Sequence, residues 1–155
     1  MKMTGETLIP APREAVWQAL NDPEILRQAI PGCESLEKTG DNSFKATVSS
    51  RIGPISARFN GNVRLSDLDP PNSYTLTGEG SGGAAGAAKG VAKVRLEPGQ
   101  GGTRLIYDVD AQITGKLAQI GSRVIDAAAK MLAGQFFERL GRAVIAALAV
   151  IWYAA

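Results

Sequence analysis

The stretch TGEGSGGAAGAAKG, residues 77–90, is the part of the chain that most resembles a cofactor site. Gly78, Gly80 and Gly83 form a G-x-G-x-x-G pattern, and Glu97 follows at roughly the distance expected of a ribose-binding acid. In dinucleotide-binding proteins such a loop joins a strand to a crossover helix and a parallel strand. Here strand-like segments flank a loop too short for a crossover. We therefore expect a hairpin whose inward positions lack side chains.

Catalytic chemistry is restricted by the absence of histidine from the 155 residues. No Ser-His or Cys-His nucleophile pair and no imidazole metal ligand can form. The single cysteine, Cys33, has no activating neighbour in sequence and is interpreted as a buried small residue rather than a reactive thiol. Asp108 and Asp110 fall on outward positions of their strand, so we expect no carboxylate pair in the interior. These observations favour a protein that is not an enzyme and holds no metal.

The composition is that of a globular protein, with 45% hydrophobic and 21% charged residues. Seventeen Lys and Arg against fifteen Asp and Glu give a net charge of +2, which does not indicate a nucleic-acid partner. The N-terminal MKMTGETLIPAP lacks the apolar stretch of a secretion signal, so a cytoplasmic protein is expected.

Helix and strand signals divide the chain into three parts. A strand around residues 3–9 is followed by two short helices, the second with Asp22 as its cap and Pro23 in its first turn. Over residues 33–114 apolar and polar residues alternate with the period of two typical of strands with one buried face. From about Leu117 the apolar period becomes helical and continues to the end of the chain.

These elements predict an α+β fold: a curved antiparallel sheet of about seven strands wrapped on a long C-terminal helix, with two short helices after the first strand. We place a single domain at residues 1–142 and an apolar helical extension at residues 143–155. The order of the elements matches the START-like helix-grip architecture.

Several strings make the resemblance more specific. Over about residues 1–142 the chain resembles the family of the G subunit of carbon monoxide dehydrogenase, in strings that include IPAPREAVW, LNDPEIL, AIPGCESLEKTGDNSFKATV, RIGPISARFNGNVRL and GTRLIYDVDAQITGKLAQIGSRVID. The resemblance implies a non-catalytic accessory of molybdenum-containing dehydrogenases, concerned with their membrane attachment or maturation. Its implied partners are a dehydrogenase complex and the inner face of the cytoplasmic membrane, where the protein would be peripheral.

A helix laid across a curled sheet encloses a space, which START-like proteins commonly use for an apolar ligand. We expect a lipophilic small molecule, quinone or another lipid, as a non-covalent ligand, with the hydroxyls of Tyr74 and Tyr107 as polar contacts. The alternatives are that the same residues only form a core, or that the fold carries a small enzyme (cyclase or hydrolase) or a maturation factor. The candidate ligand-binding residues are Phe44, Val48, Phe59, Val63, Tyr74, Leu76, Gly78, Gly80, Val94, Leu96, Tyr107, Val109, Ile120, Val124, Ala128 and Met131.

Two further regions are candidates for contact with partners. Arg58 and Arg64 fall on outward strand positions and are candidates for docking the dehydrogenase. After Arg142 the chain continues as AVIAALAVIWYAA, which as a helix reaches about 20 Å at ~1.5 Å per residue and so falls short of a bilayer core of ~30 Å. Trp152 and Tyr153 suit the headgroup boundary, and Arg139 and Arg142 suit anionic lipids. The alternative for this tail is that it packs on the domain or pairs with another chain.

Overall fold

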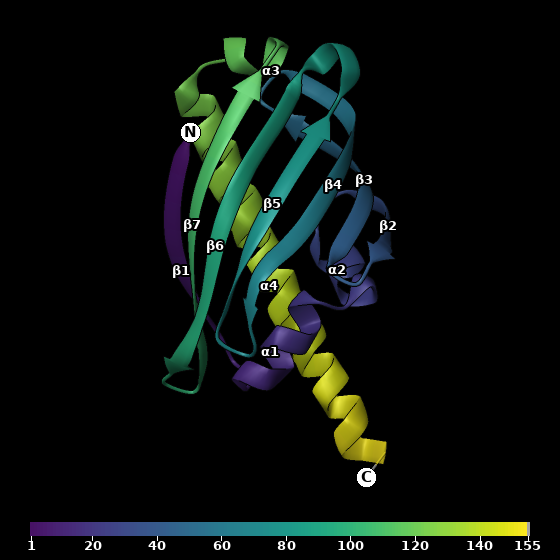
Figure 1. Cartoon of the computed structure of the whole chain (residues 1–155), viewed down its shortest axis with the longest axis vertical. Coiled ribbons are helices and arrows are strands. Elements are labelled where there is room, and N and C mark those ends of the chain that lie inside the picture. The colour runs from purple at the N-terminus through teal and green to yellow at the C-terminus, as the bar shows by residue number, and fades with distance from the viewer. Residues whose placement is uncertain (155) are drawn as a thin grey trace.

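The computed structural model describes the backbone of residues 1–154 and the side chains of residues 1–150. Seven strands form one antiparallel sheet, in the order β1-β7-β6-β5-β4-β3-β2, which curls around the long helix α4 (Figure 1). The strands are β1 (Lys2–Ile9), β2 (Cys33–Gly40), β3 (Ser43–Ile52), β4 (Ile55–Asp69), β5 (Ser73–Ser81), β6 (Ala87–Gly99) and β7 (Gly102–Thr114). The helices are α1 (Arg13–Leu20), α2 (Pro23–Ala29), α3 (Lys116–Gln119) and α4 (Ser122–Ala154), with a 3-10 turn η1 (Gly83–Ala85). The predicted fold class is confirmed.

The alternation in the sequence becomes the two faces of the sheet. Val48 lies opposite Phe59 and Leu76 opposite Ala92 on the face towards α4, whereas Lys45 lies opposite Asn62 on the outer face. Pairing of β1 with β7 places the first strand beside the last one. The sheet therefore buries one apolar face on a single helix and exposes the other to solvent.

Helices α1 and α2 cover one end of the grip. The Asp22 carboxylate accepts a hydrogen bond of 2.9 Å from the backbone N–H of Glu24, and Pro23 occupies the first turn of α2, as the sequence predicts. Trp17 of α1 contacts the Tyr74 ring edge-on, with centroids 5.5 Å apart. Beneath these helices lies the closed hydrophobic core, whose most buried members include Ile9, Val16, Leu96, Leu105, Leu140 and Val144.

The C-terminal helix differs from its prediction in one respect. It does not run on from Leu117: the short helix α3 ends before Gly121, whose φ of +97° breaks the path, and α4 starts at Ser122. The break resets the helical phase, so the inward stripe expected at Ile120, Val124 and Met131 is displaced. The face of α4 towards the sheet instead carries Ile125, Ala128, Ala129, Leu132, Phe136, Leu140 and Val144.

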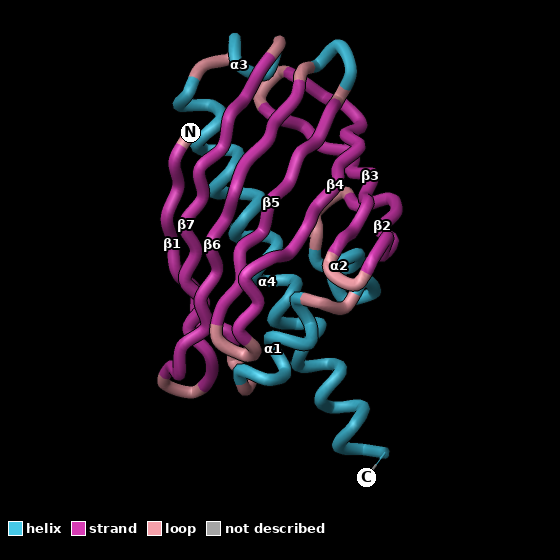
Figure 2. The backbone as a smooth tube through the Cα atoms, in the orientation of Figure 1, coloured by secondary structure: helices cyan, strands magenta, loops and turns pink. Residues whose placement is uncertain are grey.

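The far end of α4 extends beyond the rest of the molecule, at the end opposite to α3 (Figure 2). Contact with the body continues past Arg142, because Val144 is only 2% exposed and Leu148 packs against the core. Beyond the core, Val150 is 68% exposed. Trp152 and Tyr153 lie outside the described side chains. Within the described part of the chain, no helix is both long and apolar enough to cross a membrane.

Candidate ligand-binding site

An apolar cavity of about 310 Å³ lies between the sheet and α4. All the strands from β3 to β7, together with α3 and α4, contribute to its wall, and no lining side chain is ionisable. Its lining consists of Met1, Val48, Ile52, Phe59, Gly80, Ala88, Ile113, Leu117, Ile125, Ala128, Ala129 and Leu132. The lining side chains supply no acid, base or nucleophile, and the terminal ammonium of Met1 donates a hydrogen bond to the carbonyl oxygen of Ala111 at 2.8 Å. Such a lining suits an apolar guest.

Small residues in one row across the sheet keep this space open. Gly61 lies opposite Gly80, and Gly80 lies opposite Ala88. A Cβ on Gly80 would be 3.7 Å from the carbonyl oxygen of Asn60, an ordinary contact, so the missing side chain leaves room rather than relieving a clash. Ala128 and Ala129 face this row from α4. The glycines of the β5–β6 hairpin therefore act through the volume they leave empty.

The hairpin itself is antiparallel, with η1 in its loop. No strand in the described sheet runs parallel to a neighbour, so the G-x-G-x-x-G of Gly78, Gly80 and Gly83 has no strand–helix–strand unit around it. Gly82 instead lies against the ring of Phe59, since a Cβ there would be 2.6 Å from Phe59 Cε1. The expected hairpin is confirmed.

Four of the predicted ligand-binding residues line the cavity, namely Val48, Phe59, Gly80 and Ala128. Most other strand residues on that face fill the closed core below it. Phe44, Tyr74, Val94 and Leu96 are buried there, with Val63, Leu76 and Tyr107 packed against them. Gly78 lies against Val63 and Leu76, and Val109 is half-buried in register with Met3 and Ala92.

Three predicted helix residues do not line the cavity. Met131 is 54% exposed and Val124 is 38% exposed. Val124 and Ile120 approach the β3–β4 turn, where a Cβ on Gly53 would be 2.8 Å from Val124 Cγ1 and 3.7 Å from Ile120 Cδ1. Sequence reasoning missed Met1, Ile52, Ala88, Ile113, Leu117, Ile125, Ala129 and Leu132 as lining residues. Ile52 and Ile113 continue the strand alternation to its end, and this signal could have identified them.

Neither tyrosine supplies the predicted polar contact in the cavity. The Tyr107 ring lies across Gly5, in contact through its hydroxyl end, and stacks on Phe137 with centroids 5.3 Å apart. Tyr74 lies under α1, and burial raises the pKa of its hydroxyl above the ordinary value. The aromatic hydroxyls therefore belong to the closed part of the grip.

The outer face of the sheet carries a larger hollow, of about 740 Å³. Arg64 and Lys89 border it together with Glu79 and Asp110, so its charges are mixed. Such a lining suits polar contacts rather than a lipophilic guest. The outer face as a whole is not a purely basic surface.

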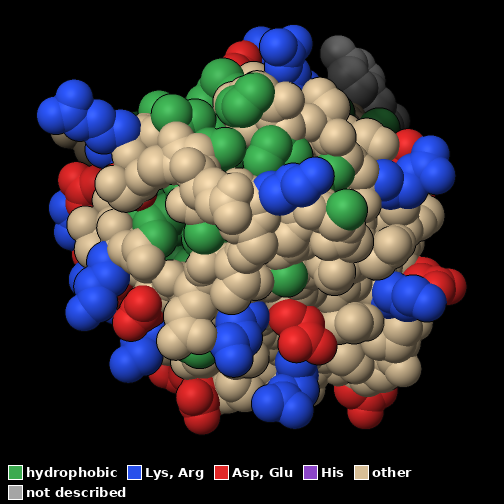
Figure 3. Space-filling model, turned by 90° about the horizontal axis from the view of Figure 1, so that it is seen from above, with side chains coloured by type: hydrophobic (Ala, Val, Ile, Leu, Met, Phe, Trp, Pro, Cys, Tyr) green, Lys and Arg blue, Asp and Glu red, His purple; other side chains and the backbone are tan. Residues whose placement is uncertain are grey.

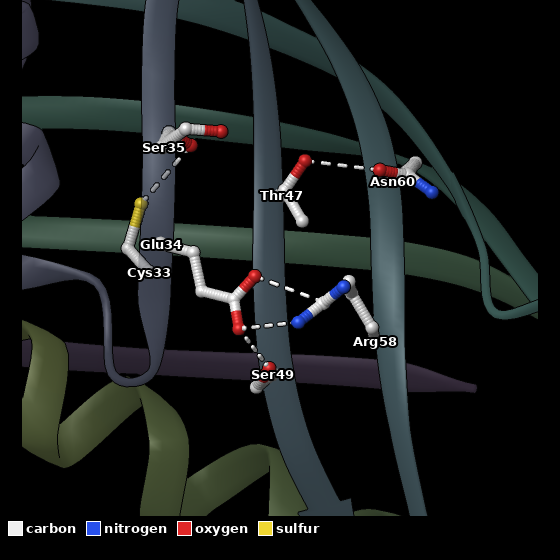
Figure 4. Close-up of polar contacts among 7 residues, drawn as sticks. All are labelled: Cys33, Glu34, Ser35, Thr47, Ser49, Arg58 and Asn60. Atoms are coloured by element: carbon white, nitrogen blue, oxygen red, sulfur yellow. Dashed lines mark hydrogen bonds and ion pairs between the residues drawn. The ribbon is translucent and has the colours of Figure 1, made fainter.

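Arg58 is held in place on this outer face (Figure 4). Its Nε lies 2.9 Å from Oε2 of Glu34, and the Ser49 hydroxyl donates to Oε1 of the same carboxylate at 2.7 Å. The hydrogen bond from Ser49 and the charge of Arg58 hold the pKa of Glu34 below its usual range. Arg58 is thus already paired, whereas Arg64 takes part in no ion pair found among the described residues.

Cys33 lies at the start of β2, and its thiol donates to the carbonyl oxygen of Ser35 at 3.4 Å (Figure 4). Partial burial raises the pKa of this thiol. Within the described residues no group of three or more His, Cys, Asp or Glu side chains is placed to hold a metal ion.

A curled antiparallel sheet around one long helix, with a cavity between them, defines a START-like helix-grip protein. The profile of the family described as the G subunit of carbon monoxide dehydrogenase (CoxG) matches residues 5–145, and the chain belongs to this family. Among curated proteins nothing matches the chain.

Solved structures share the fold. A conserved protein from Geobacillus kaustophilus is 31% identical with a TM-score of 0.88, covering 94% of this chain and 95% of its own. A protein from Thermus thermophilus is 18% identical with a TM-score of 0.70, covering 95% and 99%. A protein from Mycobacterium smegmatis is 16% identical with a TM-score of 0.72, covering 94% and 92%. The last two support the fold alone.

Proposed function

We propose that this protein is a non-catalytic accessory that binds a lipophilic molecule, quinone or another lipid, and recruits a molybdenum-containing carbon monoxide dehydrogenase-type enzyme to the membrane. The observation that carries the proposal is the cavity of about 310 Å³ with no ionisable side chain in its wall. Its volume is near the lower end of the range of about 300–1,000 Å³ typical of ligand sites. It suits one ring or a stretch of chain of a longer molecule.

Membership of the CoxG family supports the second half of the proposal, because the family name describes a subunit of carbon monoxide dehydrogenase. An enzyme that passes electrons to a membrane needs contact with a lipid-soluble acceptor. A carrier that shields such a molecule from water would provide this contact. Of the two predicted docking residues, Arg64 keeps its cation available at the outer hollow, whereas Arg58 already pairs with Glu34.

The experiment fills the cavity and measures its contents. Ala88 lines the cavity, whereas the preceding Ala87 lies on the outer face, in register with Ser81 and Thr114. Ala88→Phe should therefore remove the bound apolar molecule seen by native mass spectrometry, and Ala87→Phe should retain it. Thermal unfolding of both variants checks that they fold.

Two results would count against the carrier. One is a wild-type protein that carries no apolar molecule and binds a fluorescent apolar probe no better than Ala88→Phe does. The other is turnover of an ester substrate that Ala88→Phe abolishes, which would favour the hydrolase alternative.

A further inference from the structure

The end of the molecule at which the cavity lies has a distinct charge. Three segments meet there: residues 50–57 around the β3–β4 turn, residues 81–88 around η1, and residues 111–125 around α3. They carry the exposed Arg51, Lys116 and Arg123 and no Asp or Glu, and the exposed Asp126 follows directly after the third segment. This end, called here the cavity end, is therefore cationic on a chain of net charge +2.

The same three segments expose apolar groups. Val124 is 38% exposed, Pro54, Ala84 and Ala118 are exposed, and Ile120 is half-buried. Figure 3 looks onto this end, where hydrophobic side chains gather beside Lys and Arg side chains. Exposed apolar groups next to cations are typical of surfaces that contact a partner.

This surface is continuous with the cavity. Leu117 of α3 is buried and lines the cavity, while its neighbours Lys116 and Ala118 face solvent. Ile52 and Ile113, from the ends of β3 and β7, line it from the same end. Only the short helix α3 and the adjoining turns separate a guest in the cavity from whatever the cavity end contacts.

We propose that the cavity end docks on an anionic lipid surface. Three cations against the single nearby carboxylate of Asp126 match the negative charge of such a surface, and each Lys or Arg close to it contributes to binding. The small apolar groups suit the boundary between headgroups and acyl chains. The contact is peripheral, since no described helix could cross a membrane. An acidic protein surface would match the cations but leave the apolar groups and the adjoining cavity without a role.

The proposed lipid contact and the predicted tail anchor lie on different parts of the molecule. The C-terminal end of α4 projects from the opposite end of the molecule (Figure 1). The inference rests on the proposed function in one respect, namely that a lipophilic guest enters and leaves through the face that meets the lipid. The tail then remains available for the dehydrogenase or for a second copy of the chain.

The experiment is co-sedimentation of the full chain with phosphatidylcholine vesicles, with and without phosphatidylglycerol. The double variant Lys116→Glu and Arg123→Glu should lose at least roughly tenfold in binding to the anionic vesicles, since each charge near the surface accounts for about a fivefold factor. The matched control reverses Lys38 and Lys93, two exposed lysines away from the cavity end, and should lose much less. Both variants have the same net charge, and thermal unfolding checks their folding.

Neither variant changes a residue that lines the cavity, so native mass spectrometry separates this inference from the proposed function. Equal losses in the two variants, or full binding by the cavity-end variant, would overturn the docking surface even if the bound molecule is present. If the cavity-end variant keeps vesicle binding but loses capture of the dehydrogenase, the surface docks protein instead. An empty wild-type cavity would instead remove the carrier function, whatever the vesicles show.

Discussion

Gly86 and Gly115 meet backbone to backbone at the cavity end, where a Cβ on Gly115 would lie 2.7 Å from the Cα of Gly86. The contact joins the β5–β6 hairpin to the connection between β7 and α3. Both glycines have positive φ, +113° and +75°. No other residue type would allow this approach without moving one of the two segments.

The first prediction compares two glycines that both have a positive φ. Gly115 and Gly83 have similar φ values, +75° and +63°, but a Cβ on Gly83 would meet nothing within 4 Å. Gly83→Ala should cost only the left-handed backbone term of about 1–2 kcal/mol. Gly115→Ala should cost more, because the ψ of −151° at Gly115 combines with its positive φ in a region that only glycine adopts readily, and because the hairpin must also move. Chemical denaturation measures the difference. Equal costs would contradict both this backbone conformation of Gly115 and its close contact with Gly86.

The sheet and its faces were predictable because each strand alternates over several residues, and each turn has its own glycine, proline or asparagine. The cavity between the sheet and α4 was predictable in part for the same reason. Gly80 lies on an inward position, and a glycine there leaves volume whatever its neighbours are. Gly78 has the same parity, yet it lies against Val63 and Leu76 in the core. Alternation predicts which face of the sheet a strand residue lies on. It does not predict whether an inward residue lies at the cavity or in the closed core.

The helical side of the cavity was less predictable. A stripe counted from Leu117 assumes a continuous helix, and the positive φ of Gly121 breaks it. Isolated glycines are tolerated in helices, as Gly134 and Gly141 are in α4. The sequence does not distinguish these from Gly121. The position of the Tyr107 side chain was also not predictable from its own strand. It depends on Gly5 of β1, whose missing Cβ leaves room for the Tyr107 ring to lie flat.

The second prediction tests the phase of α4 with two substitutions to alanine. Leu140 is fully buried, so Leu140→Ala should destabilise the protein by about 2–5 kcal/mol. Met131 is 54% exposed, so Met131→Ala should change the free energy of unfolding by about 0.5 kcal/mol or less. Urea denaturation of both variants gives the comparison. A large loss of stability in Met131→Ala would instead support the inward stripe through Met131 that the sequence predicts.

The third prediction concerns Cys33. Burial raises its pKa, so less of the thiol is ionised near neutral pH than in a free cysteine. Reaction with a disulfide reagent should therefore be slower in the folded protein than in the urea-unfolded chain, and the rate should keep rising above the ordinary thiol pKa. A folded-state rate equal to or above the unfolded one would identify Cys33 as an activated thiol.

The fourth prediction concerns capture of the dehydrogenase. Arg64→Glu should weaken capture in a salt-dependent manner and cost little stability, because it breaks no ion pair described in the structure. Lys130→Glu, an exposed substitution on α4 that does not border the outer hollow, is the charge-matched control. Pull-down at low and high salt measures the effect. Undiminished capture by Arg64→Glu at low salt would remove Arg64 as a docking residue.

The fifth prediction concerns the position along α4 at which contact with the folded body ends. A truncation that tests the tail must leave the residues of the core in place. Truncation after Arg142 removes Val144, which is 2% exposed, and Leu148, which packs against the core. This variant should lose about 2–5 kcal/mol, the cost of deleting buried aliphatic side chains. Truncation after Ala149 keeps both residues and should unfold at the same temperature as the full chain.

The chain that ends at Ala149 then tests what the exposed tail does. This truncation removes Val150, which is 68% exposed, and an exposed apolar group of this kind favours contact with lipid or with a second copy. If the tail self-associates, sedimentation velocity should show the full chain as an oligomer and the chain ending at Ala149 as a smaller species. If it anchors the protein, vesicle binding should fall instead. Because the cavity end lies at the other end of α4, the charge-reversed Lys116 and Arg123 variant should leave the oligomeric state unchanged, and a change there would contradict the separation of the two ends.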